Sequence, residues 1–302
     1  MEPLISPDEP EPFAKTGIRF SFPLLLLVFA GICFPACDRG TATNKKMVAA
    51  DTITVQQKKP AADTLVKTVV KKKIYLTFDD GPNKGTRNVM NALKEENINA
   101  SLFVVGKHVF DSPEQYETWK LLQKDTSIEL CNHSYTHALS NHFKKFYQHP
   151  DTVIKDFKKS QLALELRNNI ARMPGRNAWR IGSIDHTDIR ESSAAIDSLH
   201  KAGFNVMGWD VEWQFDHKTL SPVTDPDLLL RQIENMLEAE KTRTPGHLVL
   251  LAHDQAFQKD TDIVQLQYFL RELKKNPNYE FLVATRYPVV SKPVLTIIKK
   301  GN

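Results

Sequence analysis

Short runs of consecutive apolar residues alternate along this chain with longer stretches in which apolar residues recur every three or four positions. Unbroken apolar runs are typical of strands buried on both faces, and the spaced pattern is typical of amphipathic helices. The runs predict strands at residues 74–78, 100–105, 128–130, 205–209, 247–252 and 280–283.

The spaced pattern predicts helices between these strands, at residues 86–96, 113–124, from 151 onward, 192–203, 228–240 and 260–275. Asp151 and Asp225 are suitable N-caps, Pro226 suits the first helical position, and Gly203 suits a helix end. Strands that alternate with helices are expected to be parallel and joined by crossovers. About seven such units favour an α/β protein with a distorted (β/α) barrel of about seven parallel strands over an open sheet.

The first 72 residues do not continue this pattern. A basic segment with Lys15 and Arg19 precedes an apolar run, which predicts a secretory signal peptide over residues 1–37. A single-pass anchor is the alternative, although the run is shorter than the roughly 20 apolar residues that a spanning helix needs. The rest of the chain divides into a polar, flexible tether, a folded domain and a C-terminal tail, at residues 38–72, 73–290 and 291–302.

The end of the signal segment resembles the cleavage box of bacterial lipoproteins, with Cys37 as the lipidated residue. We therefore expect an exported protein of the periplasm or cell envelope, which contacts a membrane only through an N-terminal lipid or signal anchor. Removal of Cys33 and lipidation of Cys37 would leave Cys131 alone, so no disulfide framework is predicted. Cys131 itself is expected to be a small buried residue.

The composition allows one large domain with a sizeable core, because 41% of the 302 residues are hydrophobic and 25% are charged. The net charge of +4 is mildly basic, but the lysines are scattered, so no nucleic-acid partner is implied. Peptidoglycan or an anionic membrane surface is equally compatible with this charge. We expect a monomer.

Two adjacent carboxylates, Asp79 and Asp80, stand at the end of the first apolar run and before a Gly81-Pro82 turn. Side chains alternate along an extended backbone, so one carboxylate could hold a metal while its neighbour does proton chemistry. A solvated turn is the alternative for this stretch taken alone.

His133 and His137 follow the third predicted strand, four residues apart. Two histidines at this spacing meet on one face of a helical turn, and with one Asp they would form a three-ligand site. Imidazole and carboxylate suit zinc, cobalt or nickel, and a three-ligand site leaves positions open for water and substrate.

Two further polar signals follow predicted strands. Arg172 begins the sequence RMPG, and His253 ends the most apolar strand. The histidine is either a residue at the edge of the core or a general acid or base, and its place at a strand end favours the second. In a parallel β/α protein all these side chains collect at the carboxyl ends of the strands.

These residues together resemble carbohydrate esterase family 4, the polysaccharide deacetylases built on the NodB homology domain. The resemblance covers residues 73–287 and rests on the order and spacing of TFDDGP at residues 77–82 and HSYTH at residues 133–137. It implies that Asp79 is the catalytic base, and that Asp80 joins the two histidines as a metal ligand.

The resemblance also implies roles for the later motifs. Arg172 would orient the base, and the Gly175 N–H would bind the oxyanion, although the family often has Tyr at this position. Leu251 would line the acetyl pocket, and His253 would be the catalytic histidine. The segment 176–180 either contacts sugar or is a solvated loop with one buried Trp.

The segment WDVEW at residues 209–213 is similar to a compressed form of the family's Asp/Trp motif. It implies that Trp213 forms a wall of the acetyl pocket. The carboxylate that pairs with His253 is then Asp210 or Glu212, and Asp210 is preferred. A polar insert after His137 is expected to shape substrate access, with His142 and His149 as exposed loop residues.

The function implied by the resemblance is metal-dependent N-deacetylation of an N-acetylglucosamine-containing polysaccharide, with release of acetate. The polymer would be peptidoglycan, a chitin-like chain or poly-N-acetylglucosamine, and the divalent metal Zn²⁺, with Co²⁺ or Ni²⁺ as alternatives. Two other functions stay open: an O-acetyl esterase acting on a polysaccharide such as xylan, and a carbohydrate-binding relative without turnover. A complete set of base, ligands and acid argues against the last.

Overall fold

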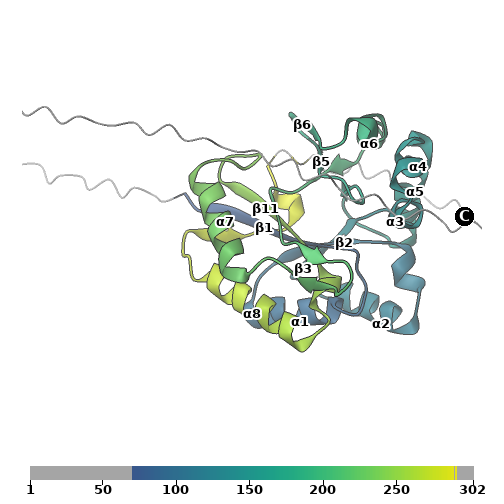
Figure 1. Cartoon of the computed structure of the whole chain (residues 1–302). Coiled ribbons are helices and arrows are strands. Elements are labelled where there is room, and N and C mark those ends of the chain that lie inside the picture. The colour runs from purple at the N-terminus through teal and green to yellow at the C-terminus, as the bar shows by residue number, and fades with distance from the viewer. Residues whose placement is uncertain (1–69, 289, 291–302) are drawn as a thin grey trace, which may run out of the picture. The chain divides into compact units, whose positions relative to one another are not determined.

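The computed structural model of the chain describes residues 70–288 and residue 290 (Figure 1). The predicted signal peptide, nearly all of the predicted tether, and the predicted tail at residues 291–302 lie outside the described residues. Among the described helices, none is both long enough and apolar enough to cross a membrane.

A ten-stranded sheet forms the centre of the fold, in the order β6-β5-β7-β4-β3-β2-β1-β11-β8, with β12 also paired to β1. The parallel strands are β1 (Lys72–Asp79), β2 (Ala100–Val104), β3 (Ile128–Asn132), β4 (Ile170–Ala171), β7 (Asn205–Val206), β8 (Val211–Glu212), β11 (His247–His253) and β12 (Tyr279–Phe281). Seven of them follow one another from β7 to β8, which confirms the predicted parallel sheet.

The sheet is mixed and open, because β5 (Ala178–Ile181) and β6 (Ile184–Thr187) form an antiparallel hairpin at one edge. Among the described strands no pairing joins this hairpin to β8, so the barrel is distorted and incomplete. Residues 178–180 therefore belong to a strand and not to a solvated loop. Trp179 is fully buried inside the barrel, where it cannot contact sugar.

Helices cover the outer face of the sheet: α1 (Thr86–Glu96), α2 (Pro113–Leu122), α5 (Pro150–Ala163), α6 (Ser193–Lys201), α7 (Pro226–Glu238) and α8 (Asp260–Lys274). Figure 1 shows α1, α2 and α8 along one side. Asp225 caps α7 as predicted, since its side chain accepts from the N–H groups of Asp227 and Leu228. Asp151 is not an N-cap, because α5 begins one residue earlier, at Pro150, and Asp151 lies in its first turn.

Shorter elements fill the connections. They are α3 (His137–Asn141), α4 (Phe143–Tyr147), the hairpin of β9 (Phe215–Asp216) and β10 (Ser221–Pro222), and the 3₁₀ turns η1 (Lys107–Phe110), η2 (Arg190–Ser192), η3 (Asp254–Phe257) and η4 (Ala284–Arg286). The insert predicted after His137 is therefore ordered into α3 and α4.

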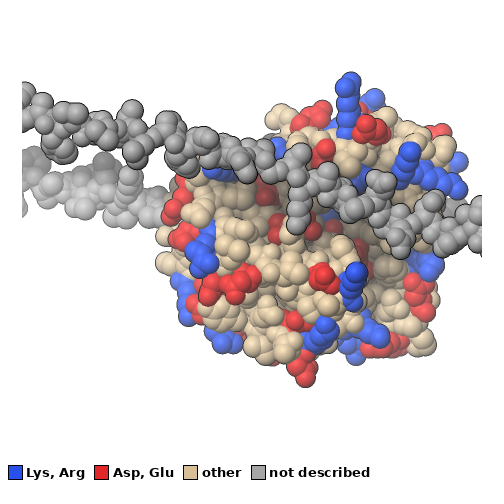
Figure 2. Space-filling model, in the orientation of Figure 1, with Lys and Arg blue, Asp and Glu red and all other residues tan. Residues whose placement is uncertain are grey.

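Buried side chains lie on both faces of the sheet, as its unbroken apolar runs predict. One cluster packs between the strands and the outer helices, and includes Ile74, Leu76 and Trp213. A second fills the barrel interior with Tyr75, Trp179 and others, and contains Cys131, which is fully buried and free as predicted. On the face shown in Figure 2, basic and acidic residues are interspersed.

Candidate active site

The predicted functional residues gather where parallel strands end. Asp79 is the last residue of β1, and it pairs in register with His253, the last residue of β11. His133 follows β3 directly, and Arg172 follows β4. The strand ends therefore bring together residues that are up to 174 positions apart in the sequence, counted from 79 to 253.

Asp80, His133 and His137 form a compact group whose ligand atoms all lie within 4.8 Å of one another. Oδ1 of Asp80 lies 3.1 Å from Nε2 of His137 and 3.5 Å from Nε2 of His133. This oxygen is buried and has no hydrogen-bond partner among the described residues. A buried, unpaired carboxylate oxygen facing two imidazoles is the arrangement that a cation would complete.

The orientation of both imidazole rings suits metal binding. Nδ1 of His133 lies 2.9 Å from the carbonyl oxygen of Arg172, which can only accept, so Nδ1 donates and Nε2 is the nitrogen that faces the carboxylates. Nδ1 of His137 is likewise bonded to Oδ1 of Asn141. Burial would raise the pKa of Asp80, but the two neighbouring histidines hold that pKa well below its usual range. The three residues thus fit a divalent metal.

Asp80 is fixed by two residues that the sequence analysis did not single out. Gln255 in η3 donates from Nε2 to Oδ2 of Asp80 across 3.2 Å, and Nδ1 of His108 lies 2.7 Å from the Asp80 carbonyl oxygen. The φ angle of Asp80 is 78°, which is unusual for a residue other than glycine. The contacts leave Oδ1 free to face the histidines.

The two histidines do not share a face of a right-handed turn, as their spacing predicted. His133 lies in the loop after β3, and His137 begins a turn in which five consecutive residues have left-handed φ angles of 48° to 71°. The buried Asp156 of α5 supports this loop, because its Oδ2 accepts the N–H groups of Tyr135 and Thr136 at 2.9 and 3.0 Å. Tertiary contacts, not helical periodicity, bring the two rings together.

Arg172 is fully buried beside the expected base. Its Nη1 donates to Oδ1 of Asp79 across 2.8 Å and to the hydroxyl of Thr77, while Nε and Nη2 donate to the carbonyls of Met207 and Gly208. The guanidinium therefore has one orientation and fixes one oxygen of Asp79. The other oxygen lies 3.6 Å from Nε2 of His133, next to the group of metal-ligand candidates.

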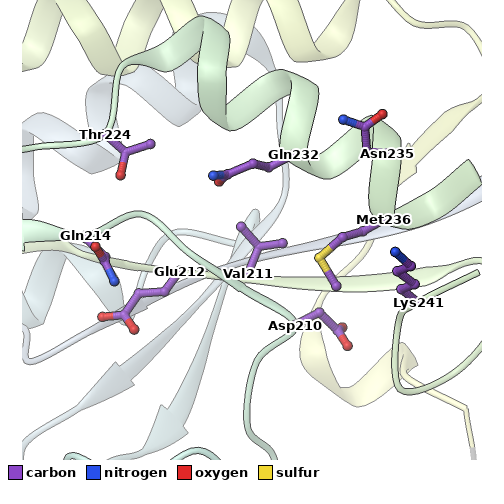
Figure 3. A pocket seen from close by; sticks show the side chains of 9 residues that line it. All are labelled: Asp210, Val211, Glu212, Gln214, Thr224, Gln232, Asn235, Met236 and Lys241. Carbon is purple, nitrogen blue, oxygen red and sulfur yellow. The ribbon is translucent and has the colours of Figure 1, made fainter. Parts of the chain in front are cut away.

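Asp210 does not face His253, which corrects the preferred pairing. Its two oxygens accept the backbone N–H groups of Arg243 and Val249 at 2.7 and 2.8 Å. Figure 3 shows the carboxyl groups of Asp210 and Glu212 pointing in different directions. Glu212 lines the same pocket as His253, and burial raises its pKa while the nearby His253 opposes that shift. Glu212 is the carboxylate on the side of His253.

The pocket beside these residues, the candidate catalytic pocket, has a volume of about 580 Å³, and both Leu251 and Gly175 line it as expected. Trp213 does not, because it is 2% exposed and packs in the core against Phe257 and Phe269. The aromatic residues that line the pocket are instead Phe143, Trp209 and Phe215. Phe215 lies against His253, with 4.8 Å between the ring centroids.

The insert after His137 contributes to this pocket through Phe143 of α4. Gly175 has φ of 62°, and a Cβ atom built there would lie 3.0 Å from the Phe143 ring. The Phe143 ring therefore fills the space that a side chain at position 175 would occupy. His142 and His149 are exposed, as predicted.

Comparison with known proteins agrees with this site. Residues 66–195 match the family model described as polysaccharide deacetylase. These residues include the two aspartates, the two histidines and Arg172. This part of the chain is therefore similar to the polysaccharide deacetylases.

Two curated relatives illustrate its range. A chitin disaccharide deacetylase of Vibrio alginolyticus is 24% identical over 200 residues, which cover 46% of this chain and 47% of that protein. A peptidoglycan-N-acetylglucosamine deacetylase of Bacillus cereus is 26% identical over 214 residues, which cover 70% of this chain and 68% of that protein. The chain thus aligns with less than half of the Vibrio enzyme.

A solved polysaccharide deacetylase from Bacillus cereus has the same fold. Its TM-score to this chain is 0.51 at 23% sequence identity, with 75% of this chain and 98% of that chain covered. The likeness supports the distorted barrel inferred from the strand order.

Proposed function

We propose that this protein removes acetyl groups from the N-acetylglucosamine units of a polysaccharide, by hydrolysis that depends on a divalent metal. One observation carries the proposal: an arginine-held carboxylate lies directly beside an Asp-His-His group that fits a metal. The relatives act on chitin disaccharide and on peptidoglycan, as their names state, and polymers of this kind are the proposed substrates.

Asp80, His133 and His137 would hold the metal, for which Zn²⁺ is our first choice and Co²⁺ or Ni²⁺ are alternatives. A metal bound there would polarise a water molecule and lower its pKa to about 7. Asp79 would take the proton from the attacking water, a role supported by its second oxygen lying 3.6 Å from Nε2 of His133. Arg172 keeps Asp79 oriented through the contact with its first oxygen.

Two further groups complete the proposed reaction. Gly175 lines the pocket, and its N–H would donate to the oxygen that becomes negative as water attacks the acetamide carbonyl. His253 would deliver a proton to the leaving amine, and Glu212 lines the same pocket. Acetate and a free amine result.

The proposal is tested by measuring acetate release from N-acetylglucosamine oligomers, isolated peptidoglycan and acetylated xylan, before and after chelation and on return of zinc. Metal-dependent release from an amide substrate is expected. Release from xylan esters alone would make the protein an O-acetyl esterase. Binding of oligomers without any release would make it a carbohydrate-binding relative.

We also propose that the protein is exported and acts in the periplasm or cell envelope, anchored through lipid on Cys37. The support is the apolar segment and the Ala36-Cys37 pair of the sequence. Cell fractionation tests this, because recovery in the cytoplasm would contradict it.

A further inference from the structure

A second hollow lies beside the catalytic pocket, between β8 and α7 (Figure 3). Its volume is about 450 Å³, which is within the range of ligand-binding clefts, roughly 300–1,000 Å³. We call it the β8–α7 groove. β8 is the last strand of the sheet, so this groove follows an edge that no other described strand covers.

The groove adjoins the catalytic pocket, and two residues line both hollows. Glu212 and Gln214 line both, one at the end of β8 and the other two residues further on. A chain molecule with one unit in the pocket can therefore extend past these two residues into the groove. Two adjoining hollows suit a ligand that is longer than the group being hydrolysed.

The lining combines unpaired polar groups with an apolar surface. The side-chain amides of Gln214, Gln232 and Asn235 line the groove and make no hydrogen bond within the described part of the chain. An amide can both donate and accept, as the hydroxyl groups of a sugar also do. Val211 and Met236 supply apolar area, which suits the C–H faces of a sugar ring.

The charges of the groove favour a neutral ligand. Asp210 lines one end, but its two oxygens are taken by the N–H groups of Arg243 and Val249. Lys241 and Glu212 carry opposite charges. A bound peptide strand is disfavoured, because β8 has only two residues and offers a very short edge for pairing.

We propose that the β8–α7 groove binds the sugar units that adjoin the unit held in the catalytic pocket, as a subsite for a neutral polysaccharide. This inference rests on the proposed deacetylase function. Gln232 and Asn235 contact the ligand from α7, three residues apart on one face of the helix.

The test compares acetate release from N-acetylglucosamine oligomers of two to six units by the full protein and two double variants. Gln232→Ala with Asn235→Ala should lower the ratio of kcat/KM for the hexamer to that for the dimer by about tenfold, the size expected for one or two lost hydrogen bonds. The control is Arg231→Ala with Glu234→Ala, which has the same spacing on the same helix at exposed positions that do not line the groove. Circular dichroism checks that both variants fold.

A ratio unchanged in the groove variant, or lowered equally in the control, would overturn the subsite and leave the proposed function intact. If the wild-type protein releases no acetate, the proposed function fails. Calorimetric titration with the hexamer then tests whether the groove binds a saccharide. Hexamer binding that the groove variant weakens and the control does not would still support a saccharide site. Binding that is absent, or equal in all three proteins, would overturn it.

Discussion

At the scale of single residues, the proposed base and the proposed metal ligand are neighbours with different contacts. Asp79 has one oxygen on Arg172 and the other 3.6 Å from His133, whereas Asp80 faces both histidines with a free oxygen. Neighbouring carboxylates thus have different surroundings, and substitutions at the two positions should have different consequences.

Asp79→Asn should lower acetate release by about 10²–10⁴-fold, because the amide cannot take the proton from water. Metal binding should persist, since the three ligand candidates are untouched. Metal content by atomic emission and acetate release by an enzymatic assay measure the two effects. Asp80→Ala is the comparison, and it should lose both; an active Asp79→Asn protein would disprove the assignment of the base.

Gln255→Ala should weaken metal affinity about 10–100-fold, the usual effect of removing a residue that orients a metal ligand. Its amide donates to Oδ2 of Asp80, and without it the carboxylate can turn away from the histidines. Competition with a chromophoric chelator measures the dissociation constant. Gln265→Ala on α8 is the matched control, and an equal loss in both proteins would rule out a specific role for Gln255.

At the scale of elements, the left-handed turn at His137–Asn141 is the least regular part of the site. Left-handed backbone costs roughly 1–2 kcal/mol for each residue with a Cβ atom. Contacts around the turn must offset this cost, and those of Asp156 with Tyr135 and Thr136 are among them.

Ser140→Gly should therefore raise the free energy of unfolding by about 1 kcal/mol, because Ser140 is exposed and has φ of 58°. The matched control is Ser198→Gly in the right-handed helix α6, which should lower stability by about 0.5–1 kcal/mol. Urea titration of both variants measures the difference. Equal destabilisation in the two variants would contradict the left-handed conformation.

Asp254 in η3 joins that element to the loop after β1, where it accepts from Asn83 and Thr86. Burial raises its pKa to about 7, although these hydrogen bonds oppose the shift. The folded protein thus keeps this proton up to about pH 7, while the unfolded chain loses it near pH 4. Its contribution to stability is complete below about pH 4 and is lost as the pH rises to about 7.

The side chain of Asn cannot ionise, so Asp254→Asn should remove this loss of stability with rising pH. Between pH 4 and 7, the unfolding free energy of the wild type should fall relative to the variant, by at most about 1.4 kcal/mol per pH unit. Urea titrations at several pH values with the metal chelated measure the slopes. Asp151→Asn, at an exposed position, should keep the wild-type slope, and parallel slopes for Asp254→Asn would disprove the shift.

At the scale of the whole molecule, the metal-ligand candidates join segments that follow two different strands, β1 and β3. A metal that binds only the folded chain should stabilise the entire barrel. At a free metal concentration 100 times its Kd, the unfolding free energy should rise by about 2.7 kcal/mol. Thermal unfolding with zinc and after chelation measures this, and Asp80→Ala should abolish the difference; an equal rise in that variant would place the metal elsewhere.

The sequence predicted the parallel sheet and the strand-end positions of the site, because both follow from hydrophobic runs and from where strands end. It did not predict the partners of Asp210, since these N–H groups come from residues 33 and 39 positions later. The burial of Trp213 could have been predicted, because side chains alternate between the two faces of an extended strand and Val211 and Trp213 are two residues apart. Val211 and Trp213 point together into the outer core, so a wall of the pocket had to come from elsewhere, such as Phe215.

The sequence also could not show the turn at His137. Nothing in the sequence HALSN requires left-handed backbone, and Asp156, which supports the loop before it, lies on a separate helix. The hairpin of β5 and β6 was likewise missed, since its strands are short and one contains the charged Arg180.

Arg172 contacts the proposed base through its side chain and a proposed metal ligand through its backbone. Its side chain orients Asp79, while its backbone carbonyl fixes the tautomer of His133. A substitution of Arg172 keeps the backbone carbonyl of this residue but removes its guanidinium. A substitution at this one position therefore removes the support of the proposed base and keeps the carbonyl that orients a proposed metal ligand, so the two proposed roles are separable at Arg172.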